Sequence, residues 1–288
     1  MRGSDRPPVA PLRWDSASGS RPLPVPVPPA RLRLLRGGRP LKRWRYVAVF
    51  AERLMLCAGS ARIGPGATSW WAVWDRERGV LAERTRMGRG RVRFSDGGGL
   101  AVIDGDVRIE VTVQEGGAVE SLNPHGAQYV WTRKQAGRPA RARVTTAAGG
   151  TIEVDGLAVV DDTAGYHARE TAWSWSAGVG RAAGGVPVGW NLVTGLNDGP
   201  VASERSVWCG DRGHEVAPVT FAEDLSSVAF AEGGALRFTS EAVRERHDRL
   251  PGLRSDYRQP FGTFDGTLPG VGPFTDGFGV MERHIARW

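Results

Sequence analysis

The sequence has few of the residues on which disulfide-rich, membrane-spanning or metal-dependent proteins rely. It holds two cysteines, Cys57 and Cys209, in separate strand-like segments without metal-ligand spacing, so we expect two buried thiols and no disulfide framework. No apolar run reaches the roughly 18 residues of a membrane-spanning helix. Residues 1–11 are charged and contain proline where a signal peptide needs an apolar stretch, so we expect a cytoplasmic location.

Motifs for cofactor chemistry are also missing. There is no nucleophile elbow, phosphate loop, dinucleotide-binding fingerprint or cysteine–histidine couple, and the glycine-rich runs lie between expected strands, where they form turns. None of the five histidines belongs to a His-x-His or Glu-x-x-His pair, the spacings typical of zinc sites. We therefore expect no metal and no organic cofactor, and we disfavour redox and phosphoryl-transfer chemistry.

Lysine is nearly absent: Lys42 and Lys134 are the only two, a bias that is typical of a GC-rich genome. The net charge of +7 is concentrated near the start, because residues 1–45 hold eleven Lys/Arg against two Asp. Pro22 to Pro29 favours a polyproline II conformation. We predict a basic, proline-rich and poorly ordered leader over 1–40. It has no aromatic interleaving or helix-turn-helix pattern, so we expect no nucleic-acid partner, while peripheral contact with an anionic membrane stays open.

Glycine and proline are abundant, with 40 and 19 residues, and they separate short segments with strand character. Strands joined by Asp-Gly and Gly-Gly turns are typical of antiparallel sheets, so we predict an all-β fold with few, short helices. One such helical turn is expected over 241–250. No helical period is sustained over the chain, which disfavours an α/β fold. A glycine-rich joint near 147–150 divides the chain into two predicted β domains, 41–147 and 148–288.

The segment from Asp161 to Trp208 concentrates tryptophan among His, Arg, Glu and Asn, the composition of a small-molecule pocket. If a strand runs from Tyr166, alternation places His167, Arg169, Trp173 and Trp175 on one face and Glu170 on the other. We predict that this aromatic and cationic face lines a barrel lumen. The alternative is a tryptophan pair in the core with Arg169 at the rim.

Further along, Glu204 is expected to move a proton if it is desolvated beside the indoles; the alternative is an ion pair between strands. Asn191 is predicted to orient an oxygen, and Trp190 and Trp208 to complete the walls. Asp161 and Asp162 are adjacent on a strand and should point apart. Glu282 and His284 share a face, which is compatible with either an acid–base pair or a structural contact.

Several ordered blocks of the sequence resemble one bacterial family, the domain of unknown function DUF2804, over roughly residues 40–288. The blocks are Asp162–His167, Thr171–Gly178, Asn191–Gly195, Ser203–Arg205, Ser255–Phe264, Gly279–His284 and Ala286–Trp288. The family is similar to double-lipocalin proteins such as carotenoid hydratases and tocopherol cyclases. The resemblance implies two consecutive lipocalin-like antiparallel β-barrels or strongly curved sheets with an apolar ligand site.

Two functions follow as expectations. The first is a cofactor-independent enzyme that hydrates, isomerises or cyclises a hydrophobic isoprenoid, polyketide or lipid-like molecule. In it, His167 and Glu204 would transfer protons, Arg169 and Asn191 would orient oxygens, and the tryptophans would form the walls. The second is a carrier or sensor that binds an apolar ligand without chemistry.

Overall fold

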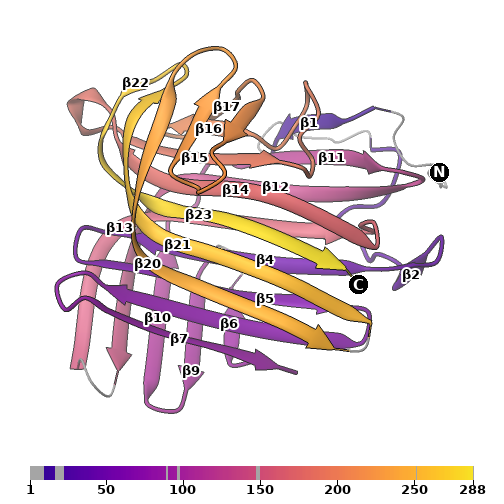
Figure 1. Ribbon diagram of the computed structural model, residues 1–288, viewed down its shortest axis with the longest axis horizontal. Coiled ribbons are helices and arrows are strands. Elements are labelled where there is room, and N and C mark those ends of the chain that lie inside the picture. The colour runs from indigo at the N-terminus through magenta and orange to yellow at the C-terminus, as the bar shows by residue number, and fades with distance from the viewer. Residues whose placement is uncertain are drawn as a thin grey trace.

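The computed structural model describes residues 10–16, 23–88, 90–95, 98–146, 150–250 and 252–287. Within these ranges there is no α-helix, and one 3-10 turn, η1 (Ala183–Gly185), is the only helical element. No helix in the described part of the chain is long and apolar enough to cross a membrane. The fold is all-β, as predicted, and it consists of two large antiparallel sheets (Figure 1).

The first sheet has eleven strands. They are β1 (Leu12–Asp15), β4 (Lys42–Phe50), β5 (Leu54–Ile63), β6 (Gly66–Asp75), β7 (Val80–Met87), β8 (Val92–Phe94), β9 (Leu100–Asp104), β10 (Val107–Val113), β11 (Val119–His125), β12 (Gln128–Thr146) and β13 (Gly150–Gly165). A separate small hairpin is formed by β2 (Leu35–Arg36) and β3 (Arg39–Pro40).

The second sheet has ten strands. They are β14 (Glu170–Arg181), β15 (Pro187–Thr194), β16 (Ser206–Cys209), β17 (Arg212–Glu215), β18 (Val219–Phe221), β19 (Ser227–Phe230), β20 (Ala235–Leu250), β21 (Leu253–Leu268), β22 (Gly272–Pro273) and β23 (Thr275–Arg287).

The two sheets share one topology. The first runs β7-β6-β5-β4-β13-β12-β10-β9-β8 and the second β17-β16-β15-β14-β23-β21-β20-β19-β18, so in each the last long strand returns to pair with the first. In each sheet, two strands that are consecutive in sequence form the two opposite edges. Both sheets curl: β8 approaches β5 and β6, and β18 approaches β15. The chain is therefore a repeat of one strongly curved antiparallel unit.

Three apolar cores follow from strand alternation. On β4, Val47 and Val49 face the inside of the first curled sheet, whereas Tyr46, Ala48 and Phe50 face the second sheet. The inside of the second sheet is filled by its own cluster, which includes Trp190 and Phe264. Parts of β4, β13 and β14 are thus buried on both faces, and the middle core holds the two sheets together.

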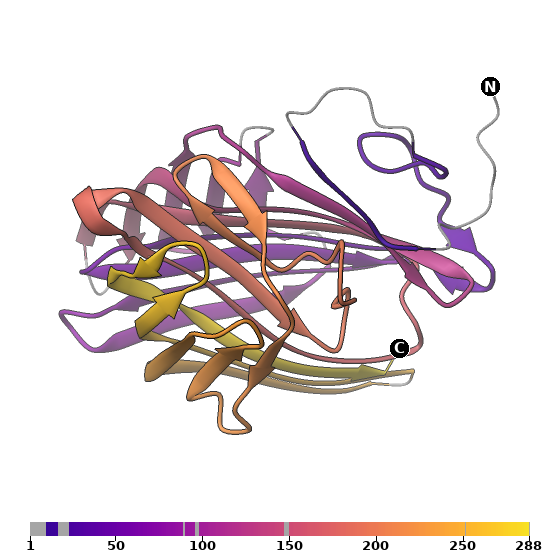
Figure 2. The same ribbon diagram turned by 90° about the horizontal axis from the view of Figure 1, so that it is seen from above.

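The leader is partly structured. Residues 1–9 and 17–22 of the predicted 1–40 segment lie outside the described residues. The remainder packs: β1 pairs with β11 (Figure 2), and Val25, Val27 and Leu32 are buried against Leu122 and other residues of the first sheet. Part of the predicted leader thus packs on the first sheet, because the apolar side chains of residues such as Val25 and Leu32 find a surface to cover.

The change from one sheet to the other lies at residues 166–169, not at the predicted 147/148. Residues 147–149 of the glycine-rich joint lie outside the described residues. On either side of them β12 and β13 pair with each other, and from Leu157 onward β13 also pairs with β4. Residues 241–250 also differ from expectation, since they continue β20 as a strand paired with β21 instead of forming a helical turn. Cys57 is buried as expected, but Cys209 is exposed.

The two sheets touch through backbone at Gly137 and Gly189. A bulge in β12 places Gly137 at φ +71° against β15, and a Cβ on Gly189 would lie 2.4 Å from the Gly137 nitrogen. We expect Gly189→Ala to lower the free energy of unfolding by about 1–3 kcal/mol, because overpacking at backbone contact has no easy relaxation. Urea unfolding measures this. Gly66→Ala, where the nearest atom is 3.4 Å away, is the control, and equal losses in both variants would contradict the account.

Candidate functional site

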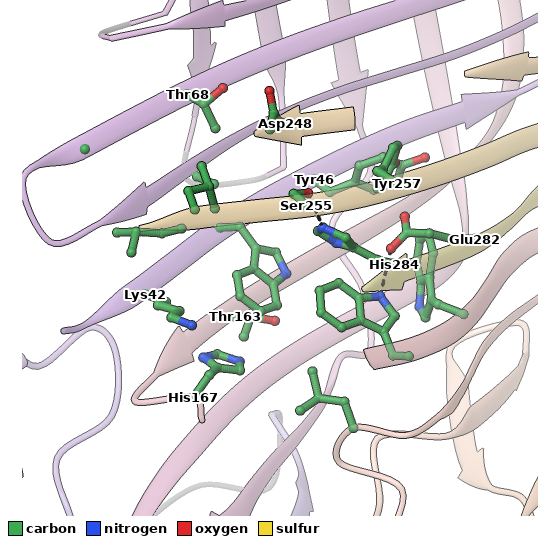
Figure 3. Close-up of a pocket in the computed structure, with 18 of the residues that line it drawn as sticks. Lys42, Tyr46, Thr68, Thr163, His167, Asp248, Ser255, Tyr257, Glu282 and His284 are labelled. Carbon is green, nitrogen blue, oxygen red and sulfur yellow. Dashed lines mark hydrogen bonds between the residues drawn. The ribbon is translucent and has the colours of Figure 1, made fainter. Parts of the chain in front are cut away.

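A cavity of about 760 Å³ lies between the two sheets. Its walls come from β4–β7, β12 and β13 on one side and from β14, β15, β20, β21 and β23 on the other (Figure 3). The volume suits a small organic molecule. The sequence placed such a cavity inside a barrel. It lies between the sheets instead, because the interiors of both curled sheets are filled by their own apolar side chains.

Aromatic rings form much of the wall. Trp44 and Tyr46 are two residues apart on β4 and both lie on the face that meets the second sheet. Trp173 and Trp175 lie in the same way on the facing strand β14. The indole planes of Trp44 and Trp173 are 9° from parallel with centroids 6.4 Å apart, and Tyr46 meets Trp175 edge-on. Parallel indoles suit a planar or conjugated apolar ligand.

Glu282 on β23 is the most unusual polar residue of the cavity. Its Oε1 accepts a hydrogen bond from Trp173 Nε1 at 2.8 Å, and its Oε2 accepts one from Gln259 Nε2 at 3.0 Å. The Tyr257 hydroxyl also donates to this carboxyl. Burial nevertheless raises the pKa of Glu282 to about 7. The carboxyl therefore exchanges protons readily at neutral pH, as a general acid or base must.

Tyr257 connects Glu282 to a buried ion pair. Arg244 Nη1 donates to the Tyr257 hydroxyl at 3.4 Å, and Arg244 Nε donates to Glu83 Oε2 on the first sheet at 2.6 Å. Burial and the neighbouring Glu282 charge raise the pKa of Tyr257 well above its ordinary value, so the hydroxyl stays protonated. The chain Glu83–Arg244–Tyr257–Glu282 fixes the carboxyl and its donor across both sheets.

His284 lies two residues along β23, on the same face as Glu282. Its Nε2 is 2.8 Å from Ser255 Oγ, and its ring meets the Trp173 indole at a centroid distance of 4.4 Å. Burial lowers the pKa of His284 to about 4. The imidazole is therefore neutral at pH 7, where it serves as a hydrogen-bonding group and not as a cation.

A second polar cluster lies at the wall where β12, β13 and residue 204 meet. Lys134 Nζ is 2.6 Å from Asp161 Oδ1 and 3.4 Å from Glu204 Oε1, and Asn197 Nδ2 donates to Glu204 Oε2 at 3.1 Å. Burial raises the pKa of Glu204 although Lys134 opposes the shift. Desolvation acts to lower the pKa of Lys134, but the charges of Asp161 and Glu204 raise it. This cluster combines two carboxylates with one ammonium.

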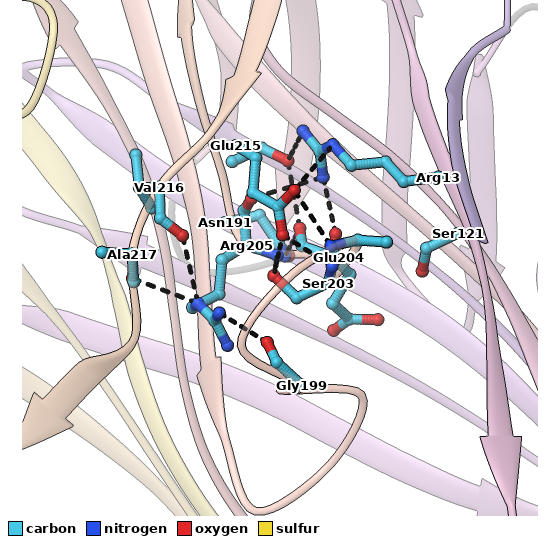
Figure 4. A network of polar contacts seen from close by, with 12 residues as sticks. Arg13, Ser121, Asn191, Gly199, Ser203, Glu204, Arg205, Glu215, Val216 and Ala217 are labelled. Carbon is cyan, nitrogen blue, oxygen red and sulfur yellow. Dashed lines mark hydrogen bonds and ion pairs between the residues drawn. The ribbon is translucent and has the colours of Figure 1, made fainter. Parts of the chain in front are cut away.

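The loop before Glu204 is held by arginines. Arg205 donates to the carbonyl oxygens of Asp198 and Gly199 at 2.8 and 2.7 Å, which closes the loop, and Arg13 of β1 donates to the Ser203 carbonyl at 2.6 Å (Figure 4). Glu215 accepts from the Ser203 backbone N–H at 2.7 Å. Glu204 thus has a fixed position, and the N-terminal strand β1 contributes to it.

Of the eight residues predicted to transfer protons, orient oxygens or form the walls, five line this cavity. They are His167, Arg169, Trp173, Trp175 and Glu204. Arg169 is exposed at the rim, and Glu170 is also exposed, where it pairs with Arg287 at 3.2 Å. The predicted strand from Tyr166 begins only at Glu170, so His167 and Arg169 belong to the connection between the sheets.

Trp190, Asn191 and Trp208 lie elsewhere. Trp190 points into the second curled sheet, where its ring packs on Phe264 at 5.0 Å. Asn191 is buried behind the wall and accepts a hydrogen bond from Trp175 Nε1 at 2.8 Å, so it orients a wall residue and does not line the cavity. Trp208 is fully buried in the core between the sheets. Strand alternation accounts for the opposite directions of Trp190 and Asn191.

Sequence reasoning missed Tyr257, Arg244 and the two lysines, which all line the cavity. A signal was present for the lysines: two of the 38 basic residues are Lys, and both are buried here. The adjacent carboxylates Asp161 and Asp162 do point apart, since Asp161 pairs with Lys134 and Asp162 lies near Arg45 at 3.4 Å. Among the described residues, no group of three His, Cys, Asp or Glu side chains is placed to hold a metal ion.

Several solved structures match most of this chain at low sequence identity. An AttH-like protein from Nitrosomonas europaea matches with a TM-score of 0.52 at 14% identity, covering 89% of this chain and 98% of that one. Kievitone hydratase from Nectria haematococca matches with a TM-score of 0.49 at 9% identity, covering 84% and 88%. CghA, in a structure with Sch210972, gives 0.43 at 8% identity, covering 86% and 88%. At 14% identity the likeness to the AttH-like protein concerns the fold alone.

No curated protein sequence matches the chain significantly. The family model for the domain of unknown function DUF2804 matches residues 103–288. The match begins later than the residue 40 expected from the sequence blocks, but it spans well over half of the chain, including the whole second sheet. The chain therefore belongs to the DUF2804 family.

Proposed function

We propose that the protein is an enzyme that acts on a hydrophobic small molecule by acid–base chemistry in the cavity between the sheets. The reaction class is hydration, isomerisation or cyclisation, and the substrate an isoprenoid, polyketide or lipid-like molecule. The observation that supports this most strongly is Glu282, a buried carboxyl with a pKa of about 7 beside the indole of Trp173.

Glu282 is assigned the role of general base. Both of its oxygens accept hydrogen bonds from fixed donors, which hold the carboxyl in place and leave each oxygen a second lone pair that can accept a proton. The base takes a proton from an acidic C–H group or from an attacking water. Neutral His284 then donates to the oxygen on which negative charge develops, while Tyr257 holds the Glu282 carboxyl and the apolar walls exclude bulk water.

His167 and Glu204, the proton-transfer candidates from the sequence, stay proposals. Both line the cavity and both have shifted pKa values: burial raises that of Glu204, and burial together with the Lys42 charge lowers that of His167 well below its ordinary range. A low pKa makes His167 a weak base. Glu204 is already engaged by Lys134 and Asn197, so Glu282 is the better-placed group.

Deuterium exchange separates the enzyme from a carrier. The protein is incubated in D2O with candidate isoprenoid, polyketide-like and fatty-acyl ligands, including any molecule that co-purifies with it, and each ligand is examined by mass spectrometry. An enzyme incorporates solvent deuterium or changes the ligand mass by one water, even where the net reaction is small. A carrier releases its ligand without deuterium incorporation or a change in mass. If every ligand that binds is released unchanged, the proposal that the protein is an enzyme is contradicted.

A further inference from the structure

One end of the cavity is basic. Arg39 of β3, Lys42 of β4 and Arg169 of the connection between the sheets all line it, with His167 between them. Figure 3 shows Lys42 and His167 close together and apart from Glu282 and His284. The cavity therefore has two chemically different ends, separated by aromatic and aliphatic walls.

Several charged residues elsewhere along the wall form ion pairs. The carboxylates of Asp161 and Glu204 meet Lys134, and Asp248 meets Arg246 at 2.7 Å. Arg244 meets Glu83 at 2.6 Å. Arg39, in contrast, donates to two backbone carbonyls, those of His125 at 2.9 Å and Tyr166 at 3.3 Å. Three cationic side chains, those of Arg39, Lys42 and Arg169, thus line this end of the cavity.

His167 has unused hydrogen-bonding capacity at this end. It is only 3% exposed, yet neither ring nitrogen makes a hydrogen bond of good geometry with a described residue. The ring rests against Trp44 with centroids 4.9 Å apart. The Gly165 backbone interacts with one side of the ring, which leaves at least one ring nitrogen unsatisfied. Buried polar groups in folded proteins are nearly always satisfied, so this nitrogen indicates a place for a ligand atom.

Lys42 places an ammonium group in a buried position, where a charge loses its hydration. Its side chain is 2% exposed and its Nζ donates to the Ala168 carbonyl at 3.3 Å. Burial and the nearby Arg39 charge lower the pKa of Lys42 to about 7. Arginine occupies all basic positions of the chain except Lys42 and Lys134. A compact ammonium group at this site therefore indicates a requirement that a guanidinium does not meet. A bound anion would offset both the desolvation and the repulsion.

We propose that the Lys42–His167 end of the cavity binds the carboxylate of a hydrophobic carboxylic acid. The carboxylate accepts hydrogen bonds from Lys42 Nζ and a His167 ring N–H, with Arg39 and Arg169 adding longer-range attraction. The apolar body lies along Trp44 and Trp173, which directs the far part of the molecule to Glu282. This inference rests on the proposed function for its reactive end, and it narrows the substrate to an acid.

Binding of matched acid and alcohol pairs tests the subsite. The probes are palmitic acid with hexadecanol, farnesoic acid with farnesol, and retinoic acid with retinol, titrated by calorimetry against the full chain. At least one acid should bind tenfold or more tightly than its alcohol. Lys42→Met should lower that acid affinity at least tenfold and leave the alcohol within twofold, while Lys42→Arg keeps much of the preference. His167→Leu should weaken acid binding by a smaller factor.

Arg43→Met is the matched control, because Arg43 is the exposed neighbour of Lys42 on β4 and its loss changes the net charge equally. The proposal is overturned if no acid in the panel binds, if acid and alcohol bind alike, or if Arg43→Met weakens acid binding as much as Lys42→Met does. Melting temperatures show whether each variant folds. Acid-selective binding without deuterium exchange would support the carboxylate subsite and contradict only the enzymatic role. Deuterium exchange without acid selectivity would support the enzymatic role and contradict the subsite.

Discussion

Replacing Glu282 with Gln is expected to lower the rate of ligand turnover, or of deuterium exchange into the ligand, by about 10²–10⁴-fold. The amide has nearly the same shape but accepts no proton, and its NH2 group faces donors such as Trp173 Nε1 and Gln259 Nε2. The binding constant of an apolar ligand should change much less, because the walls stay in place. Rate constants under saturating ligand, with binding measured separately, test this expectation.

The pH profile distinguishes a base from an acid at Glu282. Burial raises its pKa to about 7, so in the free protein the carboxylate form is lost as pH falls through 7. A general base is active as the carboxylate, and the rate should therefore rise with pH up to about 7 and then level off. Glu282→Gln should lose this rise. A rate that instead falls through pH 7 would identify the group as a general acid and contradict its assignment as the base.

Glu241 provides the matched control for Glu282. It too is a carboxylate that accepts an indole N–H, from Trp74 Nε1 at 2.9 Å, but its partner is Arg76 and it is outside the cavity wall. Glu241→Gln should leave the rate within about twofold. If Glu241→Gln and Glu282→Gln slow turnover equally, the loss reflects general loosening of tryptophan–carboxylate contacts and not catalysis.

The fold class was predictable from the sequence because Asp-Gly and Gly-Gly turns punctuate short segments with strand character. The sheet boundary was not. Residues 147–150, between β12 and β13 in the sequence, have the glycine-rich composition of a linker, and only the pairing of β13 with β12 and β4 reveals that the first sheet continues. The tryptophan-rich strand β14 corresponds by topology to β4, a relation that no short motif encodes.

The sequence predicted only part of the candidate site, because strand alternation groups residues within one strand but does not show which strands pack together. Alternation correctly grouped Trp173 with Trp175, since both lie on one strand and face the first sheet. It could not tell which side of β14 faces a cavity and which a core, because β14 is covered on both faces. Residues from distant strands, such as Lys42 and Tyr257, meet at the wall only after the two sheets pack together.

The second large effect concerns stability and the cluster around Lys134. Lys134 and Asp161 are directly opposite each other on β12 and β13, only 4% and 10% exposed, with Glu204 beside them. We expect Lys134→Met to lower the free energy of unfolding by about 3–5 kcal/mol at pH 8, because two buried carboxylates lose their counter-charge. Guanidinium unfolding measures the change. Adding Asp161→Asn should restore part of it, since one fewer charge is then left buried.

Arg133 and Asp162 form the matched comparison, because they are the adjacent pair on the same two strands but point to the opposite, half-exposed side at 4.0 Å. Arg133→Met should lower the free energy of unfolding by only about 0–1 kcal/mol.

The loss of stability in Lys134→Met should also depend on pH. Burial already raises the pKa of Glu204, and loss of the ammonium raises it further. A carboxyl whose folded pKa exceeds its unfolded pKa favours the folded state at low pH and loses that contribution as pH rises through the folded value. The difference from the native chain should therefore shrink as pH falls from 8 to 5, and a difference that grows toward pH 5 would show that the carboxylates are not the source of the instability.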